Sequence, residues 1–232
     1  MNIARLLVIG LVFLVPRVWA DACIECHQKT SPGIVADWEA SKHASAKDGA
    51  KCTSCHGGQH SKMDDAKLAK MPTAETCGTC HEAQKVQFSK GKHAHAWTAM
   101  NAMPTTHMLP AQLSSGMKGC GGCHKMGLKS AEEIDKLAKA GNRYGNASCD
   151  ACHTRHTFSK KEAQQPQACQ TCHMGFDHPQ WEMYSASKHG VRALLKQNGT
   201  LPDKVAAPTC QTCHMQEGNH EVRTAWGFLA VR

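Results

Sequence analysis

The segment CDACHTRHTFS at residues 149–159 carries the pattern that decides the fold, in which two cysteines stand two residues apart and a histidine follows the second. The same C-x-x-C-H spacing occurs at six further places and uses all fourteen cysteines. The seven sites are Cys23, Cys26 and His27; Cys52, Cys55 and His56; Cys77, Cys80 and His81; Cys120, Cys123 and His124; Cys149, Cys152 and His153; Cys169, Cys172 and His173; and Cys210, Cys213 and His214. This is the attachment signature of c-type haem, in which the thiols add to the two vinyl groups and the histidine binds the iron.

Three other interpretations of paired cysteines explain the pattern less well. A disulfide framework suits a secreted chain but gives no reason for a histidine after every pair. Zinc sites draw four ligands from paired motifs, and the spacers here vary too much for regular fingers. A thioredoxin-like redox motif would occur once, on a strand–helix unit, rather than seven times. The sequence therefore predicts seven covalently attached haem c groups, with iron as the metal.

The first twenty residues are typical of a secretory signal peptide. Arg5 precedes an apolar run at residues 6–15, and the segment ends in Val18, Trp19 and Ala20. We expect cleavage before Asp21 and a mature haem-binding domain over residues 21–232. A permanent membrane anchor is the alternative, but ten uninterrupted apolar residues are too few to span a bilayer. Because haem attachment of this kind takes place outside the cytoplasm, a periplasmic location is predicted.

The formal charge of +8 overstates how basic the protein would be with its haems bound. Removal of residues 1–20 takes away Arg5 and Arg17 and leaves 25 − 19 = +6. Each haem brings two propionates that ionise like other carboxylates, and seven haems add roughly −14. The lysines and arginines are thus best explained as counter-charge for the propionates, and no nucleic-acid partner is expected.

The spacing of the motifs predicts one haem-filled domain rather than a repeat protein. Successive motif histidines lie 29, 25, 43, 29, 20 and 41 residues apart, by subtraction of their numbers, whereas a solenoid keeps one period. Aromatic residues are few (five Trp, two Tyr and five Phe), so porphyrins would supply the large apolar surfaces of the interior. Strand-like runs are missing, which indicates a mainly α multihaem cytochrome c fold with short helices and irregular loops.

Three helices can be placed from their end signals. Ser130 with Glu133 forms a capping box before a helix that Gly141 ends. Ser159 with Glu162 repeats the signal before Pro166. A longer helix is predicted to begin at Pro179, to include Trp181, Met183, Tyr184, His189 and Leu195, and to end at Gly199.

A second set of histidines could supply the other axial ligands. Nine remain after the seven motif histidines: His43, His60, His93, His95, His107, His156, His178, His189 and His220. Any one of them alone would be explained as a surface or hydrogen-bonding residue. Nine spare imidazoles for seven irons nevertheless favour bis-histidine ligation, the arrangement of low-spin electron-transfer haems. Met174 and Met215 are less favoured alternatives, because the histidines suffice.

The chain resembles the octahaem hydroxylamine oxidoreductase family over essentially all of its mature length. The resemblance rests on MPTAETCGTCH at 71–81, CGGCH at 120–124, CDACHTRHTFS at 149–159, CQTCHMGFDHPQWEMYSASKHG at 169–190 and APTCQTCHM at 207–215. The order of the attachment sites is similar to the family's first seven. The eighth site and the long helical C-terminal region of the family have no counterpart here, since the chain stops at AWGFLAVR, residues 225–232.

The resemblance implies which residues carry the chemistry. The family's fourth haem has an open distal face, and here it would be bound by Cys120, Cys123 and His124. The family's Asp-His pair of the distal pocket falls on Asp177 and His178, with His178 as general base. Without the family match, Asp177 would be explained as a helix cap. The remaining distal ligands would be His43, His60, His93, His156, His189 and His220, which leaves His95 and His107 spare.

The resemblance also implies an activity, partners and an assembly. The expected function is redox chemistry on hydroxylamine, hydrazine or nitrite at one open haem, with the other haems passing electrons to a periplasmic cytochrome or quinone-linked protein. The family forms homotrimers. Only Tyr144 and Tyr184 are present, and neither lies in the region that supplies the crosslinking tyrosine of the oxidising members, so the direction stays open. The alternative is a pure electron carrier in which all haems are bis-histidine ligated.

Overall fold

The computed structural model describes residues 22–110 and 116–223. The predicted signal segment at residues 1–20 and the apolar stretch at 225–232 lie outside the described residues. The described residues form short helices joined by irregular segments, and they contain no strand, which confirms the mainly α prediction. The elements are α1 (Ala22–Thr30), α2 (Pro32–Glu39), α3 (Lys42–Ser45), α4 (Cys52–His56), η1 (Met63–Leu68), α5 (Ala74–Gly78), α6 (Glu82–Lys90), η2 (Lys92–His95), α7 (Ala96–Ala102), α8 (Pro104–Met108), α10 (Cys120–His124), α11 (Ala131–Lys139), η3 (Cys149–Ala151), α12 (Lys160–Ala163), α13 (Gln167–Gln170), α14 (Gln180–Ala186), α15 (Lys188–Gln197), α16 (Cys210–His214) and η4 (Gln216–Gly218), where η denotes a 3₁₀ helix.

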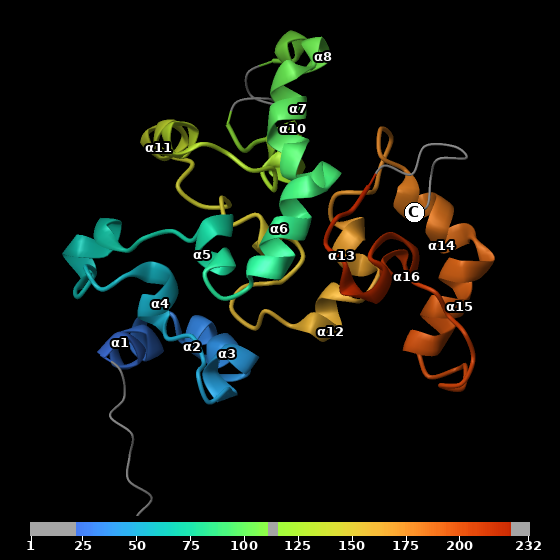
Figure 1. Cartoon of the computed structure of the whole chain (residues 1–232), viewed down its shortest axis with the longest axis horizontal. Coiled ribbons are helices and arrows are strands. Elements are labelled where there is room, and N and C mark those ends of the chain that lie inside the picture. The colour runs from blue at the N-terminus through green and yellow to red at the C-terminus, as the bar shows by residue number, and fades with distance from the viewer. Residues whose placement is uncertain (1–21, 111–115, 224–232) are drawn as a thin grey trace, which may run out of the picture.

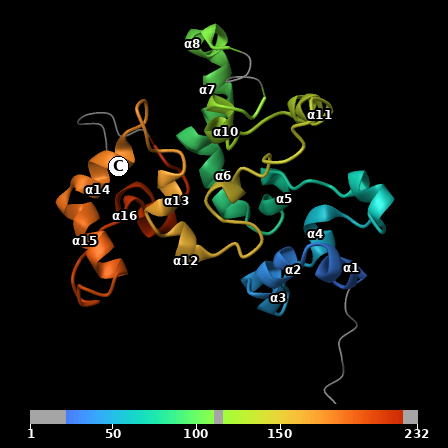
Figure 2. The ribbon, with the colours of Figure 1, turned by 180° about the vertical axis from the view of Figure 1, so that it is seen from behind.

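The helices follow one another across the molecule (Figures 1 and 2). Helices α1 to α4 lie at one end, α14 to α16 lie at the other, and α5, α6, α7 and α10 lie between them. The chain then returns to the middle, because the backbone N–H of Lys92 donates to the carbonyl of Val222 at 2.7 Å. The N–H of His220 donates to the Gln87 side chain at 3.0 Å. Helix α6 and η2 are therefore lined by a segment more than a hundred residues later in sequence.

Two of the three predicted helices form as their end signals indicate. The Ser130 hydroxyl accepts the N–H of Glu133 at 3.2 Å and begins α11, which ends shortly before Gly141. Gly141 has a φ of +86°, a conformation that glycine adopts without strain. The Ser159 hydroxyl accepts the N–H of Glu162 at 3.2 Å and begins α12.

The third prediction, one helix from Pro179 to Gly199, is wrong. The segment forms two helices, α14 and α15, with a break at Ser187. Ser187 has an extended backbone, and its hydroxyl accepts the N–H of Gly190 at 3.2 Å and thereby caps α15. A Cβ atom at position 190 would lie 2.1 Å from the Tyr184 carbonyl oxygen. The break is therefore built from a serine cap and a glycine that allows the two helices to meet.

The side-chain core is small and lies in the middle of the chain. Phe88, Ala94 and Met126 form one buried cluster, and Trp97, Met100 and Leu137 form another. Ten apolar residues are buried among those that the structure describes. Ordering the backbone costs about 1–2 kcal/mol per residue, whereas a large buried side chain contributes about 1.5–3 kcal/mol. So few side chains cannot offset the ordering of this chain, which agrees with the prediction that porphyrins supply the large apolar surfaces of the interior.

Within the described ranges, no helix has the length and apolar character needed to cross a bilayer. The longest of the α-helices named above, α15, has 10 residues, whereas a transmembrane helix needs about 20.

Candidate functional site: a series of histidine pairs

Four of the attachment motifs, the first, second, fourth and seventh, place their three reactive side chains on one short helix, α1, α4, α10 or α16. Helices α4, α10 and α16 each begin at the first cysteine of a motif and end at its histidine. Residues three and four apart share one face of a helix, so both thiols and the imidazole project together toward one haem. The CGGCH sequence of α10 has a further reason for glycine, because a Cβ at Gly121 would lie 2.2 Å from the Gly116 carbonyl oxygen.

Six of the seven motif histidines face one of the other histidines. The ring centroids are 6.0 Å apart for His27 and His60, 6.2 Å for His56 and His156, 6.1 Å for His81 and His43, 6.1 Å for His124 and His178, 6.3 Å for His153 and His220, and 5.9 Å for His173 and His93. A metal–imidazole bond is about 2 Å long, so two imidazoles on opposite faces of one iron have centroids on the order of 6 Å apart. The donor set and its spacing fit haem.

The pairs join segments that are distant in sequence. The two histidines of a pair are between 60 − 27 = 33 and 156 − 56 = 100 residues apart. The structure thus places His43, His60, His93, His156 and His220, which the resemblance implied as distal ligands, each opposite one particular motif histidine. Sequence reasoning assigned none of these partners, because the distal histidines do not follow the chain order of the motif histidines that they face. His189, the sixth predicted ligand, does not make such a ring contact with His214 in the described part of the chain.

Hydrogen bonds orient the paired rings. The Nδ1 atoms of His27, His56, His124 and His220 lie 2.8 Å from the Ser31 hydroxyl, 2.8 Å from the Lys70 carbonyl, 3.0 Å from the Ala96 carbonyl and 2.8 Å from the Gly218 carbonyl, respectively. A partner at Nδ1 fixes the ring orientation and directs Nε2 toward a metal. In the spare His107 the hydrogen bond is made by the other ring nitrogen, since its Nε2 lies 2.7 Å from the Asn101 carbonyl. His107 thus differs from the paired histidines in which ring nitrogen is hydrogen-bonded.

Burial keeps one of the paired histidines in the neutral form that binds metals. Burial lowers the pKa of His93 to about 4, with a smaller contribution from the neighbouring His173. A neutral imidazole retains the lone pair that coordinates iron. His95, two residues further along η2, is exposed and is paired with no other ring in the described residues.

The surroundings of the fourth motif contain buried polar groups without a partner in the protein. The indole N–H of Trp97 and both amide atoms of Asn146 are buried and unpaired. Trp97 packs in the cluster that also contacts Cys120. Buried donors require acceptors, and the propionates of a haem are acceptors of suitable chemistry. The ammonium of Lys129 lies 4.8 Å from the centre of the Trp97 ring, and burial lowers the pKa of Lys129 to about 8.

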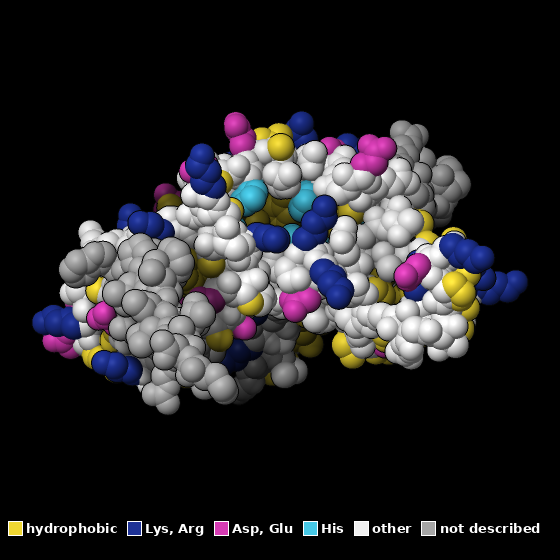
Figure 3. All heavy atoms as spheres, turned by 90° about the horizontal axis from the view of Figure 1, so that it is seen from below, with side chains coloured by type: hydrophobic (Ala, Val, Ile, Leu, Met, Phe, Trp, Pro, Cys, Tyr) yellow, Lys and Arg dark blue, Asp and Glu magenta, His cyan; other side chains and the backbone are white. Residues whose placement is uncertain are grey.

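Positive charges also stand near histidines at the surface. On the face in Figure 3, His side chains line a hollow with a hydrophobic floor, and Lys or Arg side chains lie at its rim. This arrangement agrees with the predicted role of the basic residues as counter-charge for propionates.

Asp177 and His178 lie on the loop between the sixth motif and α14. The Nδ1 of His178 is 3.2 Å from an Asp177 carboxylate oxygen, and the His178 side chain is 43% exposed. The hydrogen bond with His178, together with the Asp177 backbone N–H and the charge of His178, lowers the pKa of Asp177. The His178 ring lies opposite His124 and also 6.4 Å from His173. The structure therefore places the Asp-His pair between the fourth and sixth motifs.

Contacts between cysteines show which motifs are neighbours. The thiol of Cys77 hydrogen-bonds to that of Cys149, and the thiols of Cys169 and Cys210 make the same contact. A third contact joins Cys123 to Cys172. The fourth and seventh motifs thus both adjoin the sixth, and the third adjoins the fifth. Haems attached at these sulfur atoms would be neighbours.

Some residues of the site escaped the sequence reasoning. Asp65 accepts from His60, and Gln180 lies 3.4 Å from the Nδ1 of His173, but neither stands in a motif. The short spacing between His60 and Asp65 was the only available signal, and it is common in chains without metals. Trp97 likewise carried no sequence signal, because its role follows from burial.

The fold and the histidine pairs define a multihaem c-type cytochrome, a class of electron-transfer protein. Residues 47–230 match the family described as seven times multi-haem cytochrome CxxCH, and the chain belongs to this family. Haem c is therefore its covalently bound cofactor.

The relatives confirm the resemblance to the hydroxylamine oxidoreductase family. A probable nitrite reductase–hydroxylamine oxidoreductase fusion protein of Kuenenia stuttgartiensis is 34% identical, with 87% of this chain and 26% of that protein covered. A chain of the reducing HAO-like protein complex of the same organism matches with a TM-score of 0.59 at 34% identity, over 84% of this chain and 41% of that one. A hypothetical multiheme protein shares the fold, with a TM-score of 0.62 at 22% identity, over 90% and 53%. The present chain spans about a quarter of the curated relative.

Proposed function

We propose that this protein is a hydroxylamine oxidoreductase-like enzyme that acts on a small nitrogen compound at its fourth haem site. The observation that carries the proposal is the position of the Asp177–His178 pair, which faces His124 across the place where that haem binds. The names of the relatives, one a probable nitrite reductase–hydroxylamine oxidoreductase fusion and the other a reducing HAO-like complex, supply the substrate class.

Each part of the site has a separate role. The fourth haem, when bound, supplies an iron that takes the nitrogen atom of hydroxylamine, hydrazine or nitrite and exchanges electrons with it. His124 holds the proximal face, and its Nδ1 is fixed by the Ala96 carbonyl at 3.0 Å. His178 presents Nε2 to the distal side, while the Asp177 carboxylate holds its Nδ1 at 3.2 Å. During oxidation His178 accepts a proton from the substrate at Nε2, and during reduction it returns one.

Electrons leave or reach the fourth site through the sixth motif. Cys123 and Cys172 are in contact, and Cys169 contacts Cys210 of the seventh motif in turn. The six other haems would connect the site to a periplasmic cytochrome or quinone-linked protein. Export to the periplasm, expected from residues 1–20 and from the place of haem attachment, is part of the proposal. Assembly as a homotrimer is also part of it and comes from the resemblance.

A pure electron carrier is the second candidate, and one observation favours it. The His124–His178 separation of 6.1 Å falls within the range of 5.9–6.3 Å spanned by the pairs. If His178 binds the fourth iron directly, that haem has no position for a substrate.

Electron paramagnetic resonance of the full ferric protein and carbon monoxide binding to the reduced protein separate the two functions. We expect one high-spin haem in the ferric spectrum and one carbon monoxide bound per chain, because the proposed reaction requires an open position for the substrate on the fourth iron. Seven low-spin haems that bind no carbon monoxide would leave only the electron carrier.

Two matched variants assign the open haem, since among the described residues His189 and His214 make no ring contact with each other. Cys120→Ser with Cys123→Ser removes the fourth haem, and carbon monoxide binding should be lost. Cys210→Ser with Cys213→Ser removes the seventh haem and should leave binding intact. The opposite result would move the open position to the seventh haem and overturn the proposed site.

A further inference from the structure

The first histidine pair differs from the others in what holds its second ring. The Nδ1 of His60, opposite His27, lies 2.7 Å from the Asp65 carboxylate, and the Asp65 side chain is only 15% exposed. In three other pairs, the Nδ1 atoms of His56, His124 and His220 contact a neutral carbonyl oxygen. His27, the motif histidine of the first pair, likewise contacts a neutral group, the Ser31 hydroxyl. Asp177 is the other carboxylate in such a position, but it is 72% exposed and lies farther away, at 3.2 Å.

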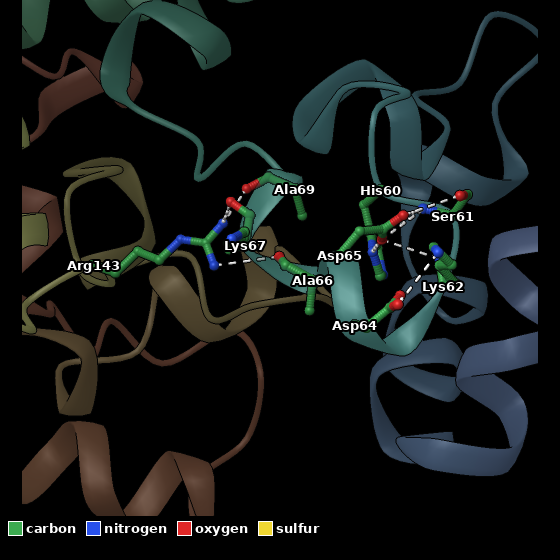
Figure 4. Close-up of polar contacts among 9 residues, drawn as sticks. All are labelled: His60, Ser61, Lys62, Asp64, Asp65, Ala66, Lys67, Ala69 and Arg143. Atoms are coloured by element: carbon green, nitrogen blue, oxygen red, sulfur yellow. Dashed lines mark hydrogen bonds and ion pairs between the residues drawn. The ribbon is translucent and has the colours of Figure 1, made fainter.

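The Asp65 carboxylate is fixed in place by its own neighbours (Figure 4). It accepts the backbone N–H of Ser61 at 3.0 Å and of Lys62 at 3.1 Å, and the Ser61 hydroxyl at 3.1 Å. These three donors favour the ionised form of the carboxylate and fix its orientation. The carboxylate that faces His60 is thus charged and has little freedom to turn away.

The C-terminal end of η1 is hydrogen-bonded to a residue that is distant in sequence. Arg143, between α11 and η3, donates to the carbonyls of Ala66, Lys67 and Ala69, and the Lys67 contact is 2.8 Å (Figure 4). The last carbonyls of a helix have no partner within it, and a guanidinium satisfies several at once. With Asp65 bonded at its start and Arg143 at its end, η1 forms a rigid support for His60.

A charged acceptor at Nδ1 changes the basicity of the imidazole ligand as well as its orientation. A hydrogen bond to a carboxylate is roughly twice as strong as one to a neutral oxygen, and it raises the basicity of the other ring nitrogen. A more basic Nε2 stabilises ferric iron relative to ferrous iron, because the ferric ion carries the greater positive charge. One electron enters the iron on reduction, and the proton stays between His60 and Asp65.

We propose that Asp65 is a positioning residue that lowers the reduction potential of the first haem through its hydrogen bond to His60. The inference rests on the proposed ligation of that haem by His60, and it is independent of the chemistry at the fourth haem. Its consequence is a haem at the α1 end of the molecule that stays oxidised after its neighbours are reduced.

The test compares Asp65→Asn with Asp64→Asn by spectroelectrochemical titration of the full seven-haem protein. The two variants remove the same charge at adjacent positions, but Asp64 is 74% exposed and pairs only with Lys62, at 3.2 Å. Asp65→Asn should raise the ferrous-to-ferric ratio of the first haem about tenfold at a fixed potential, which is about 59 mV for a one-electron couple. Asp64→Asn should change the ratio by less than about twofold, and Asp65→Glu should restore the parent behaviour.

Further measurements make each outcome decisive. The first haem's signal is identified as the one missing in Cys23→Ser with Cys26→Ser, and the mass of each variant confirms its haem content. Equal shifts in the two asparagine variants, or no shift in either, overturn the role of Asp65. His60→Ala tests the ligation separately: if the first haem stays low-spin, the ligand assignment is wrong, while carbon monoxide binding at the fourth haem still reports on the proposed function.

Discussion

Replacing His178 with alanine is expected to lower kcat for hydroxylamine or nitrite by about 10²–10⁴-fold, the usual contribution of a positioned general acid or base. The alanine removes the Nε2 that exchanges protons with the substrate but leaves both thioether bonds and the proximal His124. Steady-state turnover, with haem content measured by mass, checks the expectation. Haem content should equal that of the parent protein.

The control for this variant is His107→Ala. His107 lies in α8, and its Nε2 already contacts the Asn101 carbonyl at 2.7 Å, so it is free of any assigned role in ligation or catalysis. Turnover should change by less than about twofold, as for most surface substitutions. A His178→Ala protein that retains parental kcat would remove His178 from the mechanism. A newly high-spin fourth haem in this variant would show instead that His178 was an iron ligand.

The second large effect is expected from His93→Ala. His93 faces His173 at 5.9 Å, and burial holds it in the neutral form. Its loss should convert the sixth haem from low spin to high spin and raise carbon monoxide binding from one to two molecules per chain. Because the sixth motif adjoins both the fourth and the seventh, electron transfer away from the fourth site should slow as well. Electron paramagnetic resonance of the ferric protein measures the change of spin state. Carbon monoxide titration of the reduced protein measures the number of molecules bound per chain.

His95→Ala is the matched control, since His95 lies in the same short helix η2 but is exposed. The resonance spectrum and carbon monoxide binding of this variant should equal those of the parent protein. If His95→Ala and His93→Ala give the same spectrum, the assignment of His93 to the sixth haem is wrong.

The sequence predicted the covalent chemistry well because that chemistry is local. Two cysteines and a histidine within five residues determine a haem site regardless of the surrounding fold. The caps at Ser130 and Ser159 were predictable for the same reason, since each depends on one hydroxyl and one N–H three residues away. The break at Ser187 was missed, because residues on both sides of it favour a helix and only packing shows the two helices turning.

Ligand partners could not be predicted, since they depend on long-range geometry. His56 pairs with His156 and not with the nearer His60, and no residue pattern near either of them indicates this. The Asp65 contact and the Arg143 contacts with η1 join groups whose closeness only the fold establishes. The resemblance supplied candidate positions for the five distal histidines that face motif histidines in the structure, but not their order.

The long sequence separation within the histidine pairs limits the order in which the protein can be assembled. His27, His56, His124 and His153 all face a histidine that is synthesised later, and the last of these, His220, follows His153 by 67 residues. A haem attached at one of these four motifs would lack its second imidazole until the later part of the chain has folded onto it. Contacts between such distant residues also slow folding. We therefore expect axial coordination to be completed late in folding, with the irons of these four sites open to other ligands until then.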